Sequence, residues 1–216
     1  MTDGTALREI AAEILTEILE KGQYTHLALF QALSKYQYLE KSDRSFLKRI
    51  VDGTVEYKIQ IDYIINAYSK TKVHKMKPFI RTLLRMSVYQ IYYMDRVPDS
   101  AACNEAVKLA SVRGYGSLKG FVNGVLRTAA KKKQAIPLPE RGTAEYLSVA
   151  YSHPLWLVRM WIAYYGYEET EQICAYDNQS PDVTIRVNTL KTNTQALKKK
   201  DCSMCRMKAL SSRYGC

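Results

Sequence analysis

The feature that most limits the fold of this chain is a helical repeat of apolar residues through its first 133 residues. In the first segment the apolar positions follow one another at helical spacing: Leu7, Ile10, Ala11, Ile14, Leu15, Ile18 and Leu19. This spacing places them on one side of an α-helix. Similar stripes predict further helices from about 25, over 41–68, from 78, around 102–110 and around 118–126. Gly53 lies inside the 41–68 stretch, which is therefore either two helices or one with a tight packing contact.

The pattern changes after residue 131. Residues 131–142 combine three lysines with two prolines and a glycine, which predicts a linker or, alternatively, an ordered surface loop. Helical patterns return over about 143–176, and the β-branched residues 183–187 alternate as in a strand. We therefore expect a mostly α fold. It comprises an all-α domain at 1–133, a linker at 134–142, a partial α+β subdomain at 143–199 and an atypical, unstructured tail at 200–216.

Charge is the second informative feature. The chain of 216 residues has 32 Lys and Arg against 21 Asp and Glu, a formal net charge of +11. Residues 1–133 hold 22 of these basic and 13 of the acidic residues, so most of the excess lies in the helical part. A basic helical domain favours a polyanionic partner, most simply a nucleic acid. The alternative is a protein that is basic without such a partner.

Several classes of protein are disfavoured. No apolar run approaches the ~18 residues that a membrane-spanning helix needs, and the first residues do not resemble a secretory signal. The five cysteines are odd in number and do not suggest a disulfide framework. We expect a cytoplasmic protein with reduced thiols and no membrane partner.

Four stretches resemble motifs of NusB-like RNA-binding domains. They are residues 43–55, 84–90, Pro98 with 104–107, and 121–127. The resemblance implies a NusB-like helical bundle for the first domain.

A second resemblance narrows the family. Residues 152–158, Trp161, 165–166, Asn178 and 186–189 are similar to the region that precedes the catalytic domain of the bacterial 16S ribosomal RNA cytosine-C5 methyltransferases, the Sun/Fmu or RsmB-type family. Together the two resemblances run from about residue 5 to 198. They imply RNA, in particular small-subunit ribosomal RNA, as the partner. In the full-length family they also imply a Rossmann-like domain that binds S-adenosylmethionine and supplies two catalytic cysteines.

That catalytic apparatus is missing from the residues at hand. No glycine-rich turn follows a strand, and the chain after Val187 is too short for a doubly wound sheet. Cys202 and Cys205 lack the proline and glycine of the family's catalytic motifs. With Cys216 they supply three thiolates, fewer than a structural zinc usually takes. We therefore expect no catalytic residue, cofactor or metal in this chain, and interpret it as truncated before the catalytic domain, through a shortened or frameshifted gene.

Six basic residues within or beside the NusB-like motifs are candidate RNA contacts, since Lys and Arg supply most of the affinity for phosphate: Arg8, Arg44, Lys48, Arg113, Lys119 and Arg127. Each alone could instead be an ordinary solvated charge. The lysines at 131–133 are likewise a solvated face or a further RNA contact. Asn123, amid apolar residues, is interpreted as buried and bonded to the backbone.

Three functions remain open at this point. The first is RNA binding by the NusB-like domain of a ribosomal RNA methyltransferase, with a role in ribosomal RNA processing. The second is a NusB-type antitermination factor that regulates transcription, although such a factor has no use for residues 143–190. The third is a helical scaffold for protein interactions. The sequence leaves the oligomeric state open.

Overall fold

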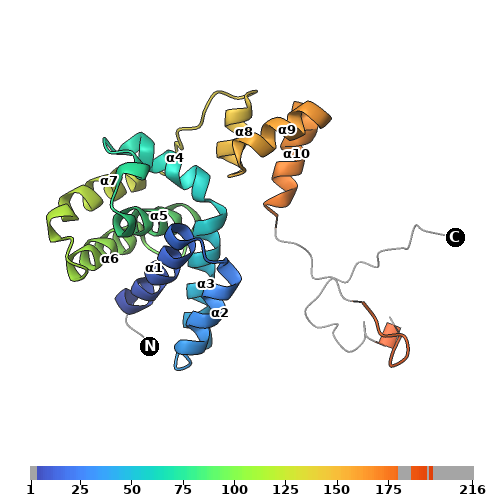
Figure 1. Ribbon diagram of the computed structural model, residues 1–216, viewed down its shortest axis with the longest axis horizontal. Helices are drawn as coiled ribbons and strands as arrows, with labels where there is room; N and C mark the ends of the chain where they lie inside the picture. Colours follow the sequence, from blue (N-terminus) through green and yellow to red (C-terminus); the bar gives the residue numbers. More distant parts are fainter. Residues whose placement is uncertain (1–3, 180–185, 194, 197–216) are drawn as a thin grey trace. The chain divides into compact units, whose positions relative to one another are not determined.

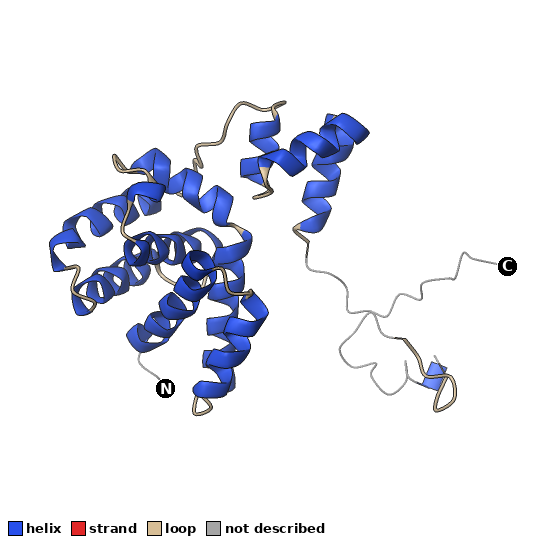
Figure 2. Ribbon diagram, viewed as in Figure 1, coloured by secondary structure: helices blue, strands red, loops and turns tan. Residues whose placement is uncertain are grey.

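The computed structural model describes residues 4–179, 186–193 and 195–196, and it divides into two compact units, 1–178 and 179–216. The described residues form helices and no strand (Figures 1 and 2). The helices of the first unit are α1 (Gly4–Lys21), α2 (Thr25–Lys35), α3 (Lys41–Glu56), α4 (Lys58–Tyr68), α5 (Pro78–Tyr93), α6 (Asp99–Val112), α7 (Lys119–Lys131), α8 (Ala144–Ala150), α9 (Leu155–Tyr165) and α10 (Tyr167–Asp177), with short 3₁₀ helices η1 (Val73–Lys75) and η2 (Gly116–Leu118). The predicted helical bundle is confirmed.

The second unit is described only in part. The Asn188 side chain accepts a hydrogen bond from the backbone N–H of Leu190, 3.0 Å away, which closes a turn. The predicted strand at 183–187 falls mostly on residues outside the described ones, while Arg186 and Val187 have no regular secondary structure. The predicted tail at 200–216, with Cys202, Cys205 and Cys216, also lies outside the described residues.

Helix α5 forms the centre of the bundle and contacts α1, α3, α4, α6 and α7 (Figure 1). Pro78 begins the helix, where its missing N–H leaves no hydrogen bond unmade. Leu83, Leu84 and Ile91 are fully buried. Burial of such side chains contributes about 1.5–3 kcal/mol each, so this helix carries much of the stability of the bundle.

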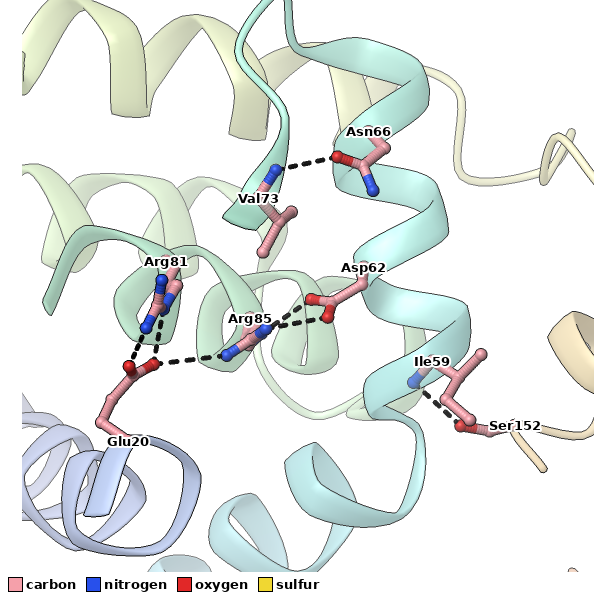
Figure 3. Close-up of polar contacts among 8 residues, drawn as sticks. All are labelled: Glu20, Ile59, Asp62, Asn66, Val73, Arg81, Arg85 and Ser152. Carbon is pink, nitrogen blue, oxygen red and sulfur yellow. Dashed lines mark hydrogen bonds and ion pairs between the residues drawn. The ribbon is translucent and has the colours of Figure 1, made fainter. Parts of the chain in front are cut away.

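Charged residues also tie the central helix to its neighbours. Arg85 of α5 is buried and donates two hydrogen bonds to the Asp62 carboxylate of α4, at 2.7 and 2.8 Å (Figure 3). Its other side faces Glu20 of α1, which also accepts hydrogen bonds from Arg81. Four charges from three helices are therefore paired within the fold.

Helices α8, α9 and α10 build a smaller core from Tyr146, Leu147, Val158 and Cys174. Helix α8 packs on α4. At that contact the Gln60 side chain donates to the carbonyl of Ala150 at 3.0 Å. The α8–α10 segment is thus joined to the bundle through the start of α4.

Candidate nucleic-acid interface

Arg8, one of the six predicted contacts, lies inside the fold. Only 8% of its surface is exposed. Its Nε donates to the Gln90 side chain at 2.7 Å, and its guanidinium lies 5.4 Å from the centre of the Phe46 ring. Arg8 therefore holds α1 against α5 and α3, and its charge does not reach the surface as an RNA contact would.

Arg44 and Arg113 are also engaged by other parts of the protein. Arg44 donates to the backbone carbonyls of Leu39 and Gln37, at 3.0 and 2.9 Å, and so fixes the connection between α2 and α3. Arg113 forms ion pairs with Glu9, at 2.8 Å, and with Glu13. The two carboxylates compensate the charge of Arg113.

Lys48, Lys119 and Arg127 are exposed, and none has a hydrogen-bond or ion-pair partner among the residues that the structure describes. Lys48 lies on α3, one turn from Asp52. Burial raises the pKa of the Asp52 carboxyl, and the charge of Lys48 opposes that rise. Lys119 and Arg127 share α7. The structure therefore places two of these three predicted contacts on one helix.

A groove of about 600 Å³ runs between α6 and α7. It is lined by Pro98, Ser100, Ala101, Asn104, Glu105, Val107, Lys108, Asn123 and Arg127. Helix packing thus brings together two motifs, residues 104–107 and 121–127, that lie on different helices. Their side chains offer amides that donate and accept hydrogen bonds, and a guanidinium that can bind a phosphate in bidentate fashion.

Glu105 is the acidic group of this groove, and the protein balances its charge. Lys108 lies 2.7 Å from its carboxylate, and the Thr5 hydroxyl donates a hydrogen bond to it. Burial raises the pKa of Glu105, but the hydrogen bonds from Lys108 and Thr5 outweigh that effect and hold the pKa below its usual value. The carboxylate is therefore ionised and paired, which leaves Arg127 to set the charge that a ligand meets.

Of the groove residues only Arg127 was among the predicted contacts, and the polar side chains of Asn104, Lys108 and Asn123 are among those that were not. Asn123 is half-buried and lines the groove, which differs from its interpretation as a buried structural residue. A signal was present, because Asn104 and Lys108 are four residues apart, as are Asn123 and Arg127. This spacing places each pair on one side of its helix.

Other kinds of site find little support in the described part of the chain. Cys103 and Cys174 are buried, and burial raises the pKa of both thiols, that of Cys174 to about 11. Neither suits a thiolate nucleophile. The described residues contain no group of three or more His, Cys, Asp or Glu side chains that could hold a metal ion. They also contain no helix long and apolar enough to cross a membrane.

Two family profiles match this chain. The NusB family matches residues 5–131. The RsmF/B-like methyltransferase ferredoxin-like domain matches residues 153–200. The first match covers the helical bundle, α1–α7. The second covers α9 and α10 and continues beyond them.

Comparison with an individual protein agrees with these two family matches. The probable ribosomal RNA small subunit methyltransferase B of Bacillus subtilis (strain 168) is 37% identical over 197 residues, which are 89% of this chain and 43% of that protein. The chain thus spans less than half the length of this relative.

Solved structures that share the fold include the following two. The crystal structure of PH0851 superposes with a TM-score of 0.66 at 22% identity and covers 94% of this chain and 45% of that one. NusB of T. maritima gives a TM-score of 0.57 at 22% identity and covers 63% of this chain and 95% of that one.

Proposed function

This chain belongs to the NusB family, and from that premise we propose that it is the RNA-binding part of a small-subunit ribosomal RNA methyltransferase. The observation that carries the proposal is the α6–α7 groove, where Arg127 is exposed and uncompensated beside the Asn104 and Asn123 amides. A guanidinium suits phosphate, and amides can bond to base edges or ribose. The groove therefore offers the kinds of group that bind a nucleic-acid strand.

The region after the bundle supports a methyltransferase rather than an antitermination factor. The structure of T. maritima NusB, which consists of the bundle alone, covers 63% of this chain. The sequence similarity to the Bacillus methyltransferase covers 89% of it. An antitermination factor of the NusB type would need only the bundle. We propose residues 1–133 as the RNA-binding domain, 134–142 as a linker and 143–199 as the start of a second subdomain.

The methyl donor is a separate question. S-adenosylmethionine is the cofactor that the family resemblance implies, and its site needs a glycine-rich turn after a strand and an acidic residue for the ribose. The described residues contain no strand and no such turn, so they do not fit this cofactor. We therefore assign them a binding role and derive no methyl-transfer step from them. A cytoplasmic location accords with a ribosomal RNA partner.

The proposal is tested by binding to an unmodified transcript of small-subunit ribosomal RNA at two or more salt concentrations. We expect the logarithm of the association constant to fall linearly with the logarithm of salt, by about 0.7–0.9 for each phosphate neutralised. Binding that does not respond to salt, or no binding at all, would refute the proposal. A strong preference for a boxA-type antiterminator RNA would favour the antitermination factor instead.

A further inference from the structure

The connection between α4 and α5 presents a row of cations to solvent. Within residues 69–77 the side chains of Ser69, Val73 and Met76 are buried. The exposed residues between them are mostly basic: Lys70, Thr71, Lys72, His74, Lys75 and Lys77. The apolar anchors point inward, so the lysines are left on the outer side. No ion pair joins these lysines to another described residue.

The backbone of this connection is held in place. The Asn66 side chain accepts a hydrogen bond from the N–H of Val73 at 2.9 Å (Figure 3). Ser69 Oγ accepts from the N–H of Thr71 at 3.1 Å and donates to the carbonyl of that residue at 2.8 Å. A segment that is already ordered loses less conformational entropy when a ligand binds. The lysines therefore stand on a preformed support.

Nearby carboxylates are already paired with other cations. Glu20, near the end of α1, is bonded to Arg81, and Asp62, in α4, is bonded to Arg85 (Figure 3). The connection itself contains no Asp or Glu. The positive charge of the exposed lysines is therefore not cancelled locally.

The lysine run at the end of α7 lies beside the α4–α5 connection. The Lys132 ammonium is 5.3 Å from the centre of the Tyr68 ring, and the Tyr68 hydroxyl donates to the carbonyl of Ala135 at 3.4 Å. Lys133 faces Asp99 at 3.7 Å. Asp99 follows Pro98, which lines the α6–α7 groove. The lysine run thus lies between that groove and the α4–α5 connection.

We propose that the exposed lysines of residues 70–77, together with Lys131 and Lys132, form a second RNA-binding surface, which takes the phosphate backbone of a strand that leaves the α6–α7 groove. This inference rests on the proposed function. It adds a surface that binds phosphates without regard to sequence, while the groove supplies the amides that can read bases. No exposed apolar side chain stands among the lysines at 70–77 to enter a bilayer, which favours RNA over a lipid surface.

The test compares two triple variants of the full chain. K70E/K72E/K75E changes the proposed surface, and K21E/K35E/K41E changes three exposed lysines elsewhere by the same charge. The probe is unmodified small-subunit ribosomal RNA between about 50 and 200 mM salt. The first variant should bind about tenfold more weakly than the second, with a salt slope smaller by about 2, because three phosphate contacts are lost. Circular dichroism checks the fold, and K70Q/K72Q/K75Q should show a smaller loss of the same sign.

The outcomes separate this inference from the function on which it rests. If the unchanged chain does not bind RNA, the proposed function fails. If it binds, and the two triple variants have equal affinity and slope, the second surface is refuted and the proposed function stands. If the unchanged chain binds vesicles of phosphatidylserine and phosphatidylcholine as tightly as RNA, and only K70E/K72E/K75E loses vesicle binding, the surface is a membrane contact and the inference is wrong.

Discussion

The backbone N–H of Ile59 donates a hydrogen bond to Oγ of Ser152, 3.1 Å away and 93 residues later in the chain (Figure 3). Ile59 lies in the first turn of α4, where N–H groups have no partner within their own helix. Ser152 therefore caps α4 from a distant segment. It does so with a φ of 58°, in the left-handed region. This contact joins the part that matches the NusB family to the region that precedes the second match.

The first prediction concerns this cap. Ser152→Gly removes the hydroxyl but keeps the positive φ accessible, so we expect a loss of about 1 kcal/mol, the net contribution of one hydrogen bond. Ser152→Ala should cost more, because alanine is strained at that φ. Amide hydrogen exchange in α8–α10 should quicken in both variants. Unchanged exchange would mean that the cap does not hold the segment.

Helix packing at Gly53 leads to the second prediction. A Cβ atom there would overlap the Tyr89 ring. Gly53→Ala should therefore destabilise the protein by about 1–3 kcal/mol through overpacking. Gly124→Ala is the control, because nothing lies within 4 Å of that Cβ position and alanine favours a helix by about 1 kcal/mol. Urea unfolding should give opposite signs for the two variants, and equal signs would contradict the close contact.

The region around Gly53 also shows how far the sequence predicts this fold. The apolar spacing predicts the helices well, because burial on one side of a helix leaves a periodic trace. For residues 41–68 the apolar spacing did not distinguish two helices from one helix with a tight packing contact. The structure shows both features, with α3 ending at Glu56 and Gly53 against Tyr89. At the break between the two helices, the Tyr57 ring stacks on the Tyr93 ring of α5, with 4.3 Å between the ring centres. The apolar spacing within residues 41–68 cannot reveal a partner that lies on another helix.

The candidate site was harder to predict for a related reason. A sequence reveals which residues are cationic, but not whether a carboxylate from another helix compensates them. Arg113 pairs with Glu13, 100 residues earlier, and Arg8 is covered by side chains of α3 and α5. Conversely, Asn104 and Arg127 line one groove only because α6 packs on α7.

The third prediction compares two buried threonines. The Thr82 hydroxyl is fully buried and has no hydrogen-bond partner within the described structure. An unsatisfied buried donor costs about 1–3 kcal/mol, so Thr82→Val should stabilise the protein by about 1 kcal/mol. Thr54 is equally buried but donates to the Ile50 carbonyl at 2.6 Å. Thr54→Val should therefore destabilise, and calorimetric melting temperatures that shift in the same direction would exclude this explanation.

The fourth prediction concerns pH. The hydrogen bond from Arg81 does most to lower the pKa of Glu20, and the charges of Arg81 and Arg85 add to it against the effect of burial. A lowered pKa means that Glu20 stabilises the fold above its ordinary value of 4.5, and that this contribution is lost as pH falls through the lower folded value. Glu20→Gln should cost about 2 kcal/mol at pH 7, and the difference should shrink below pH 4.5.

Asp52 supplies the opposite case for this experiment. Burial raises the pKa of its carboxyl, so the ionised form destabilises the fold at neutral pH. Asp52→Asn should therefore stabilise at pH 7, with a gain that fades as the pH falls and the native carboxyl takes up its proton. Chemical denaturation at several pH values measures both variants. Parallel pH profiles for Glu20→Gln and Asp52→Asn would show that the environments of the two carboxyls have been misjudged.

The last prediction ranks two arginines that the sequence treats alike. Arg127 is exposed in the α6–α7 groove without a carboxylate partner among the described residues, whereas Arg113 is held by Glu9 and Glu13. Arg127→Ala should weaken RNA binding and lower the salt slope by about 1, because one phosphate contact is lost. Arg113→Ala should leave the slope unchanged and lower the melting temperature instead, since its charge serves the fold. Measuring slope and melting temperature for both variants separates the two roles, and a larger slope change for Arg113 would reverse the ranking.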